Sequence, residues 1–101
     1  MASRSEKQFE KAFVEKLKAF PGAHVIPKTH PYGVKGILDR YACINGHFVG
    51  LEFKKHEKAK RDPIQEWEVA KIRDSGGTAF FVYPENEGSV LARLRELSKS
   101  P

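Results

Sequence analysis

The chain has 101 residues, 40% of them hydrophobic, and a single cysteine. This length supports one hydrophobic core, so we predict a single domain over residues 1–101 with its core at about 6–98. One cysteine excludes an internal disulfide and a thiolate cluster for zinc, which favours a reducing, intracellular setting. The formal net charge of +5 is compatible with a polyanionic partner such as nucleic acid, although a mild excess of lysine is common.

Two further classes of protein are not expected from the sequence. No apolar run approaches the roughly 20 residues of a membrane span. The first residues, MASRSEKQ, lack the apolar segment of a signal peptide. We therefore expect a cytoplasmic protein that is neither secreted nor inserted in a membrane.

The first predicted helix runs from about residue 6 to residue 19. Ser5 and Gln8 have the spacing of an N-terminal capping box, and Pro21-Gly22 ends the segment. Glu10 lies at the margin of the apolar face of this helix. It is either a boundary residue with its carboxylate in water or an acidic group that reaches a site on the sheet. The apolar face consists of residues at helical spacing: Phe9, Phe13, Leu17 and Phe20.

A short strand is predicted over residues 24–30, although it contains Pro27. Proline cannot donate a hydrogen bond to a central ladder, so this strand suits an edge or a bulge. A loop over residues 30–36 follows, with Gly33 and Gly36 as hinges.

A β-hairpin is predicted in the middle of the chain. Its strands, 37–44 and 47–55, flank Asn45-Gly46, a pair that tolerates the positive φ angles of a tight turn. With a two-residue turn, Asp39 stands directly opposite Glu52. The Cβ atoms of such opposed residues lie about 4.5 to 5.5 Å apart.

The second half of the chain predicts a helix, a strand and another helix. Asp62 and Pro63 form an N-cap and a first helical residue, and Gly76-Gly77 ends this helix after about residue 75. Residues 78–83, TAFFVY, are a continuous apolar run that requires cover on both faces of a sheet. The last helix has Ser89 as its expected N-cap and an apolar face of Val90, Leu91, Leu94 and Leu97.

The predicted order is therefore α-β-β-β-α-β-α, without repeats, linkers or low-complexity segments. This order predicts an α/β fold of the α+β kind, in which helices pack against a mixed sheet.

Three charged residues interrupt the largely apolar hairpin. Glu52 and Lys54 share one face of their strand because alternate residues point the same way, and Asp39 stands across from Glu52. Two carboxylates this close repel each other in a partly buried site, so we expect a cation that compensates their charge. That cation is either Lys54 or a divalent metal. Oxygen ligands of this kind suit Mg²⁺ or Mn²⁺. The alternative is a solvated cluster of charges on an edge hairpin.

These residues resemble the motif of the PD-(D/E)xK nuclease superfamily: Asp39, then Glu52-Phe53-Lys54, preceded by a helical acid. More narrowly, GILD, GLEFKK and PIQEWEVAKIRDSGGTAFFVY resemble the virus-type replication-repair nuclease (VRR-NUC) family, over about residues 6–83. The resemblance implies a restriction-endonuclease-like core and a metal-dependent phosphodiesterase. One departure is Leu38, where the superfamily name has proline, and it removes no ligand.

The resemblance also implies a set of metal ligands and catalytic residues. Asp39, Glu52 and the backbone carbonyl of Phe53 are implied as ligands of Mg²⁺ or Mn²⁺, with Glu10 as a further helical acid on the same metal. Lys54 is implied as the catalytic lysine, which holds the attacking water or stabilises the pentacovalent phosphate.

Two residues of the second helix have more than one interpretation. Gln65 is placed at the active site by the resemblance, but as the third residue after Asp62 it also suits a capping box. We expect Trp67 to pack against the sheet or a partner subunit, with base stacking as the alternative.

Basic and aromatic residues flank the predicted site on both sides. Any one of them is most simply a solvated charge, whereas the whole set predicts contacts with nucleic-acid phosphates. The set consists of Lys28, His30, Tyr32 and Lys35 before Asp39, and of Lys55, His56, Lys58, Lys60 and Arg61 after Lys54.

The sequence thus predicts a Mg²⁺- or Mn²⁺-dependent endonuclease that hydrolyses DNA without a small-molecule cofactor. A domain this small has little room for a recognition module, so we expect specificity from DNA shape or from a homodimer acting on branched DNA, such as a Holliday junction in DNA repair. The resemblance favours a bacterial or phage setting. One alternative is a non-catalytic nucleic-acid-binding module with a relic of the site, and another is an interaction protein whose basic face is incidental.

Overall fold

The structure is a computed structural model that describes residues 5–28 and 36–99. The order of its elements confirms the predicted α-β-β-β-α-β-α arrangement, with one added 3₁₀ turn. The elements are α1 (Glu6–Lys18), β1 (Ala23–Val25), β2 (Arg40–Ile44), β3 (His47–Phe53), α2 (Pro63–Asp74), β4 (Thr78–Val82), η1 (Pro84–Asn86) and α3 (Glu87–Lys99).

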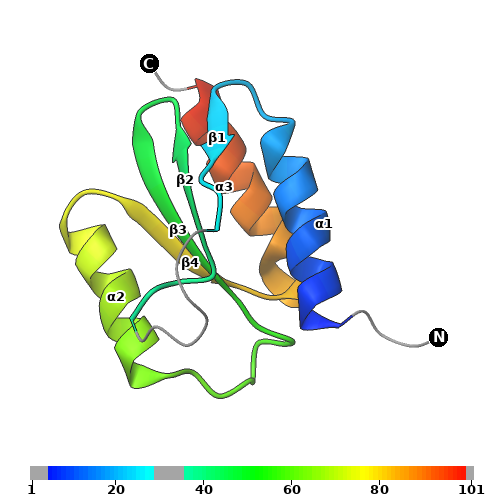
Figure 1. The fold of residues 1–101 in the computed structure, drawn as a ribbon, viewed down its shortest axis with the longest axis vertical. Helices are drawn as coiled ribbons and strands as arrows, with labels where there is room; N and C mark the ends of the chain where they lie inside the picture. The colour runs from blue at the N-terminus through cyan, green and yellow to red at the C-terminus, as the bar shows by residue number, and fades with distance from the viewer. Residues whose placement is uncertain (1–4, 29–35, 100–101) are drawn as a thin grey trace.

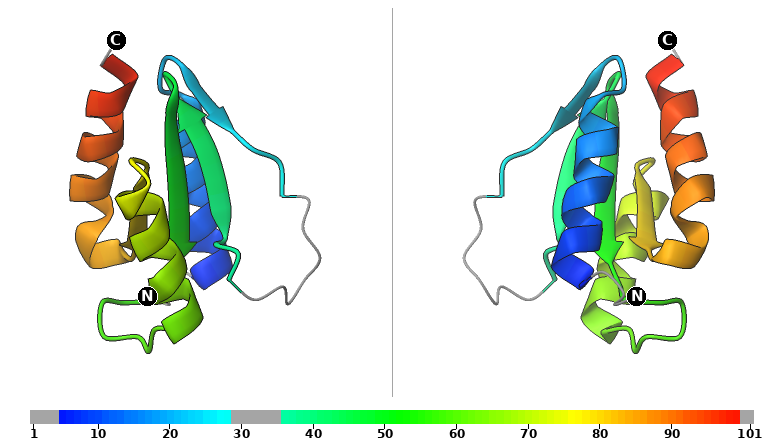
Figure 2. Two further views of the ribbon diagram at one scale, coloured as in Figure 1. Left: turned by 90° about the vertical axis from the view of Figure 1, so that its left-hand side faces the viewer. Right: turned by 90° about the vertical axis from the view of Figure 1, so that its right-hand side faces the viewer.

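The four strands form one mixed sheet in the order β1-β2-β3-β4. The pairs β1/β2 and β2/β3 are antiparallel, and β3/β4 is parallel. Helices α1 and α3 cover one face of this sheet, and α2 covers the other (Figures 1 and 2). The fold is therefore a three-layer α+β domain, and no helix among the described residues is long and apolar enough to cross a membrane.

Each face of the sheet has its own hydrophobic core. On the side of α1 and α3, the rings of Phe9, Phe13 and Phe53 meet edge to face, with Phe13 and Phe53 centroids 5.3 Å apart. On the side of α2, the core consists of Leu38, Val69, Ile72, Ala79 and Phe81. The apolar strand β4 contributes to both sides, which confirms that it is covered on both faces.

The predicted caps and turn explain where several elements begin and end. Ser5 and Gln8 form the expected capping box at the start of α1, and Asp62 accepts a hydrogen bond from the Ile64 N–H at the start of α2. The hairpin turns at Asn45-Gly46, with φ angles of 49° and 86°. The pairing runs from Ile44 opposite His47 to Arg40 opposite Leu51, so both hairpin strands are shorter than predicted.

Three local predictions were wrong. Ser89 is not an N-cap, because α3 already begins at Glu87 and the Ser89 hydroxyl donates to the carbonyl of Asn86, the last residue of η1. The first strand spans Ala23–Val25 rather than 24–30, and residues 29 and 30 lie outside the described part. The first interpretation of Trp67, packing against the sheet, is wrong because 61% of this residue is exposed, whereas packing against a partner subunit stays a prediction.

Candidate functional site

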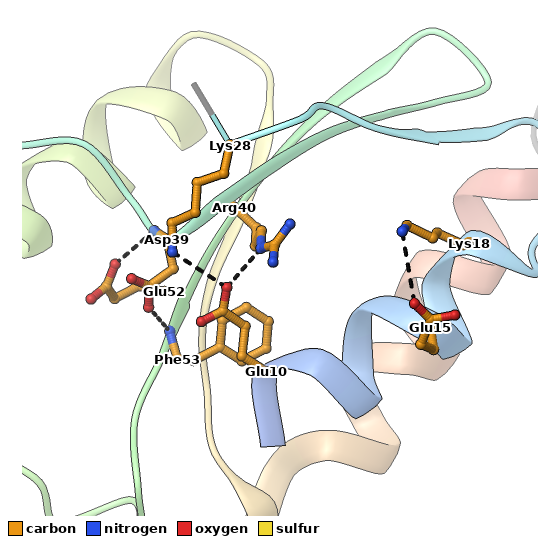
Figure 3. A network of polar contacts seen from close by, with 8 residues as sticks. All are labelled: Glu10, Glu15, Lys18, Lys28, Asp39, Arg40, Glu52 and Phe53. Atoms are coloured by element: carbon orange, nitrogen blue, oxygen red, sulfur yellow. Dashed lines mark hydrogen bonds and ion pairs between the residues drawn. The ribbon is translucent and has the colours of Figure 1, made fainter. Parts of the chain in front are cut away.

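The two hairpin carboxylates lie side by side and are joined by reciprocal backbone hydrogen bonds (Figure 3). The Asp39 N–H donates to Glu52 Oε1 over 3.0 Å, and the Phe53 N–H donates to Asp39 Oδ2 over 2.9 Å. This geometry follows from the register, since Arg40 pairs with Leu51 and the next step along the strands brings Asp39 to Glu52. The predicted juxtaposition of these two side chains is confirmed.

Both carboxyl groups are more difficult to ionise than ordinary surface acids. Burial, and after it the nearby charge of Asp39, raise the pKa of Glu52 to about 7. Burial also raises the pKa of Asp39, with a smaller contribution from the charge of Glu10. Two acids that repel each other in a desolvated site provide a place where a cation is strongly favoured.

Lys54 and Gln65 complete a chain of polar contacts with Glu52. The Gln65 amide donates from Nε2 to Glu52 Oε2 over 2.7 Å, and Lys54 Nζ donates to Gln65 Oε1 over 3.1 Å. Lys54 Nζ also lies 3.8 Å from Glu52 Oε2, and only 15% of the lysine side chain is exposed. The Gln65 side chain is thus directed at the site, where it holds the Lys54 ammonium beside Glu52.

Glu10 reaches the same region from α1, on the other side of the sheet. It is buried rather than turned to water, which excludes the interpretation that it is a solvated boundary residue. Its Oε2 atom accepts from Arg40 Nε over 2.6 Å and lies 3.6 Å from Lys28 Nζ (Figure 3). Two cations therefore share one oxygen of Glu10 beside Asp39.

Arg40 is a site residue that the sequence analysis missed. Successive strand residues point to opposite faces, so Arg40 is directed at the face that α1 covers, where an apolar residue is usual. A charged residue in the inward-facing series of β2 was the available signal. Its acidic partner lies 30 positions earlier on α1, and only the packing of α1 on the sheet brings the two together.

The donor set fits a hard divalent cation. The carboxylates of Asp39 and Glu52 are oxygen ligands of the kind that Mg²⁺ and Mn²⁺ prefer, and a cation between them would relieve their mutual repulsion. Within residues 5–28 and 36–99, no group of three or more His, Cys, Asp or Glu side chains has an arrangement that could hold a metal ion. In this structure Glu10 is ion paired with Arg40 and Lys28.

The predicted nucleic-acid contacts are spread over several environments. Lys28 pairs with Glu10, and Lys55, His56, Lys58 and Lys60 are exposed in the loop after β3. Arg61 is half-buried, with its guanidinium 4.4 Å above the centre of the Phe81 ring. A pocket of about 490 Å³ brings the end of this loop to the site, since it is lined by Lys54, Lys60, Arg61, Asp62, Pro63 and Gln65. His30, Tyr32 and Lys35 lie outside the described residues.

One comparison with known proteins agrees with the fold. No family model and no curated protein matches the sequence. A solved structure described as a "VRR_NUC domain" is similar to this chain, with a TM-score of 0.71 and 26% sequence identity. The similarity covers 89% of this chain and 97% of that one.

The three-layer α+β arrangement and this similarity define the class: a nuclease-type domain with a restriction-endonuclease-like fold. Within that class, the resemblance to the VRR-NUC family is confirmed by the structural similarity over most of the chain.

Proposed function

We propose that this protein is a Mg²⁺- or Mn²⁺-dependent endonuclease that hydrolyses phosphodiester bonds in DNA. The observation that carries the proposal is the Asp39–Glu52 pair, which is held together by two backbone hydrogen bonds and has raised pKa values. A desolvated pair of acids is costly for a fold that has no use for it, because burial disfavours both charges. The similarity to a VRR_NUC domain supports the same activity.

Asp39, Glu52 and the backbone carbonyl of Phe53 are the residues that would hold the metal ion, with Glu10 as a further acid. When bound, the ion supplies positive charge to the phosphodiester and lowers the pKa of water. Both contacts of Glu10 are made through Oε2. Glu10 can therefore position Arg40 with this oxygen and turn Oε1 toward the site.

Lys54 has the chemistry of a catalytic lysine. Its ammonium is fixed by Gln65 and Glu52, so it can donate to an attacking water or to a phosphate oxygen without a large reorganisation. Gln65 is a positioning residue, since it bonds to Glu52 and Lys54 at once. The charged side chains of the loop after β3, together with Lys28, would hold the flanking phosphates.

The experiment that tests this function is cleavage of supercoiled and linear DNA with Mg²⁺, with Mn²⁺ and with EDTA. We expect metal-dependent cleavage by the wild type, no cleavage by Asp39→Ala or Glu52→Ala, and a loss of about 10²-fold or more in Lys54→Ala, as is usual when a transition-state stabiliser is removed. Glu96→Ala, which removes an exposed acid on α3, is the matched control and should cleave normally. Full cleavage by the Asp39→Ala, Glu52→Ala double variant would refute the proposal.

The substrate is expected to be DNA of a particular shape, such as a junction or another branch, bound by a homodimer. A panel of linear, flapped and four-way DNA separates a junction-resolving enzyme from a flap nuclease or a nicking enzyme. Salt-sensitive DNA binding without any metal-dependent product would instead identify a binding module with a relic of the site.

A further inference from the structure

A second pocket, of about 290 Å³, lies beside the proposed active site, between α2, β4 and the residues after β4. It is lined by Arg61, Glu66, Val69, Ala70, Arg73, Phe80, Phe81, Tyr83 and Asn86. Strands β3 and β4 are parallel and Phe53 pairs with Val82, so their carboxyl ends lie at the same end of the sheet. Arg61 lines both this pocket and the pocket that contains Lys54 and Gln65, and the two pockets are therefore neighbours.

Two arginines of this pocket are held in place by the protein. The Arg61 guanidinium is stacked on the Phe81 ring, 4.4 Å from its centre. Arg73 donates from Nε to the Ala79 carbonyl over 2.9 Å. A guanidinium has five N–H donors, so these contacts leave donors for a ligand.

Another part of the pocket lining is also fixed by hydrogen bonds. Asn86 donates from Nδ2 to the Phe81 carbonyl and accepts from the Tyr83 N–H, both over 2.9 Å. Rigid elements that hold two guanidinium groups at one pocket are suited to a phosphate, because the planar fork of arginine matches phosphate oxygens.

We propose that this pocket, here called the Arg61–Arg73 pocket, binds an internal phosphate of the DNA strand that leaves the active site on the β4 side. The proposal rests on the proposed function for the identity of the ligand. Arg73 lies eight residues after Gln65 on α2, about 12 Å along the helix axis. At roughly 3.4 Å per nucleotide, the bound phosphate is about two to four nucleotides from the scissile one.

Glu66 places one opposing charge in the wall of the pocket. It is exposed on the first turn of α2 and would repel a phosphate at this position. Removing a charge from Arg73 and removing one from Glu66 should therefore change DNA affinity in opposite directions. A general effect of net charge would give the same opposition, so the local site is distinguished by a control variant that removes an arginine elsewhere on the surface.

The first test measures DNA binding as a function of salt, in an Asp39→Ala background that does not cleave. We expect Arg73→Ala to weaken binding about 3- to 10-fold and to reduce the slope of log affinity against log salt by about 1, as loss of one phosphate contact predicts. Arg73→Gln keeps a donor for the Ala79 carbonyl and should behave the same way. Glu66→Gln should tighten binding.

The matched control is Arg93→Ala, which removes an exposed arginine from α3 and should leave affinity and slope nearly unchanged. Equal losses in Arg73→Ala, Arg73→Gln and Arg93→Ala would overturn the proposal, because they would show that only net charge matters. Melting temperatures of all variants check that the fold is retained.

The second test locates the phosphate with DNA that carries one neutral methylphosphonate at successive positions. One substitution, about two to four nucleotides from the scissile phosphate, should weaken binding of the Asp39→Ala protein but not of the same protein with Arg73→Ala. If Arg73→Ala weakens the binding only of DNA with a terminal phosphate, the ligand is a strand end and the assignment to an internal phosphate fails.

The two proposals fail separately. Normal cleavage together with unaltered DNA binding by Arg73→Ala would refute the phosphate site and leave the proposed nuclease activity supported. DNA binding that depends on Arg73, without metal-dependent cleavage, would support the phosphate site and refute the proposed nuclease activity.

Discussion

At the scale of single residues, the main feature is the Asp39–Glu52 pair, two acids whose charged forms are disfavoured by burial. Glu52 is only 4% exposed, and burial and the charge of Asp39 together raise its pKa to about 7. An acid whose pKa is higher in the folded state than in the unfolded state binds more protons when folded. The fold is therefore stabilised by protonation of Glu52, and this stabilisation is lost as the pH rises through the folded pKa.

The first residue-scale prediction follows from the direction of the pKa shift of Glu52. Without divalent metal, the stability of the wild type should fall as the pH rises from about 4.5 to 7, the range between the ordinary and the raised pKa of Glu52. Asp39→Asn keeps an oxygen for the Phe53 N–H and removes the repulsion. We expect Asp39→Asn to melt above the wild type at about pH 8 in EDTA and the difference to shrink at about pH 5.

Thermal melts at the two pH values measure this difference. Glu96→Gln, an exposed acid on α3, serves as the control and should show no such dependence on pH. A wild type that is as stable as Asp39→Asn at the higher pH would contradict the prediction.

The second residue-scale prediction concerns Gln65. Its hydrogen bond to Glu52 lowers the pKa of that acid, so Gln65→Ala should raise the pKa further. If cleavage requires ionised Glu52, the acidic limb of the pH–rate profile should move to higher pH. Lys54 would also lose a partner, which lowers the rate at every pH.

The pH dependence of cleavage by Gln65→Ala and by the wild type checks this expectation. Ile64→Ala, an exposed neighbour on α2, should leave the position of the limb unchanged. A lower rate without any movement of the limb would show that Gln65 acts through Lys54 alone.

Residue-scale features were predictable where they depend on local geometry. The Asp39–Glu52 pair follows from a two-residue turn and from strand alternation, and Ser5 and Asp62 cap their helices as expected. The inward direction of Arg40 was predictable from strand alternation, but its partner was not, because Glu10 lies on a distant helix.

At the scale of elements, the sheet brings the site together because each helix layer contributes one polar group at the end of the hairpin. Gln65 comes from α2 on one face, and Glu10 comes from α1 on the other. The close approach of α2 depends on Gly50 of β3. A Cβ atom at Gly50 would lie 2.9 Å from both Ile72 Cδ1 and Leu38 Cδ1.

The element-scale prediction is that Gly50→Val destabilises the protein by about 1 to 3 kcal/mol, the usual cost of overpacking a core. Denaturant unfolding measures this loss. Gly88→Ala is the matched control, because a Cβ atom there meets nothing within 4 Å. The control lies in α3 and should gain about 0.5 to 1 kcal/mol, since alanine favours the helix. Unchanged stability in Gly50→Val would show that the Ile72 and Leu38 side chains, or α2 itself, can move aside.

The open edge of β4 is protected by side chains rather than by another strand. Arg73 and Asn86 donate to the carbonyls of Ala79 and Phe81, which would otherwise be free to pair with another chain. Boundaries of elements were less predictable than their order. The start of α3 was misplaced because Pro84–Asn86 forms a 3₁₀ turn that leads directly into the helix.

At the scale of the whole molecule, the proposed action on branched DNA requires two sites to be presented together. A homodimer is the simplest way for a chain of 101 residues to do so. Exposed apolar side chains on and near α2 include Trp67 and Ile64, with Phe48 on β3. Sedimentation equilibrium should show a dimer at micromolar concentration. A species with one protein chain, even with DNA bound, would contradict this prediction.

The sequence by itself determined the order of the elements, the caps of two helices, the hairpin turn and the facing of Asp39 and Glu52. These features depend on residues that are neighbours along the chain or are related by a short turn, where backbone geometry leaves few alternatives. The tertiary structure alone decided the ion pairs of Glu10, the direction of Gln65, the exposure of Trp67 and the Arg61–Arg73 pocket. These features depend on how separate layers pack, which local periodicity does not specify.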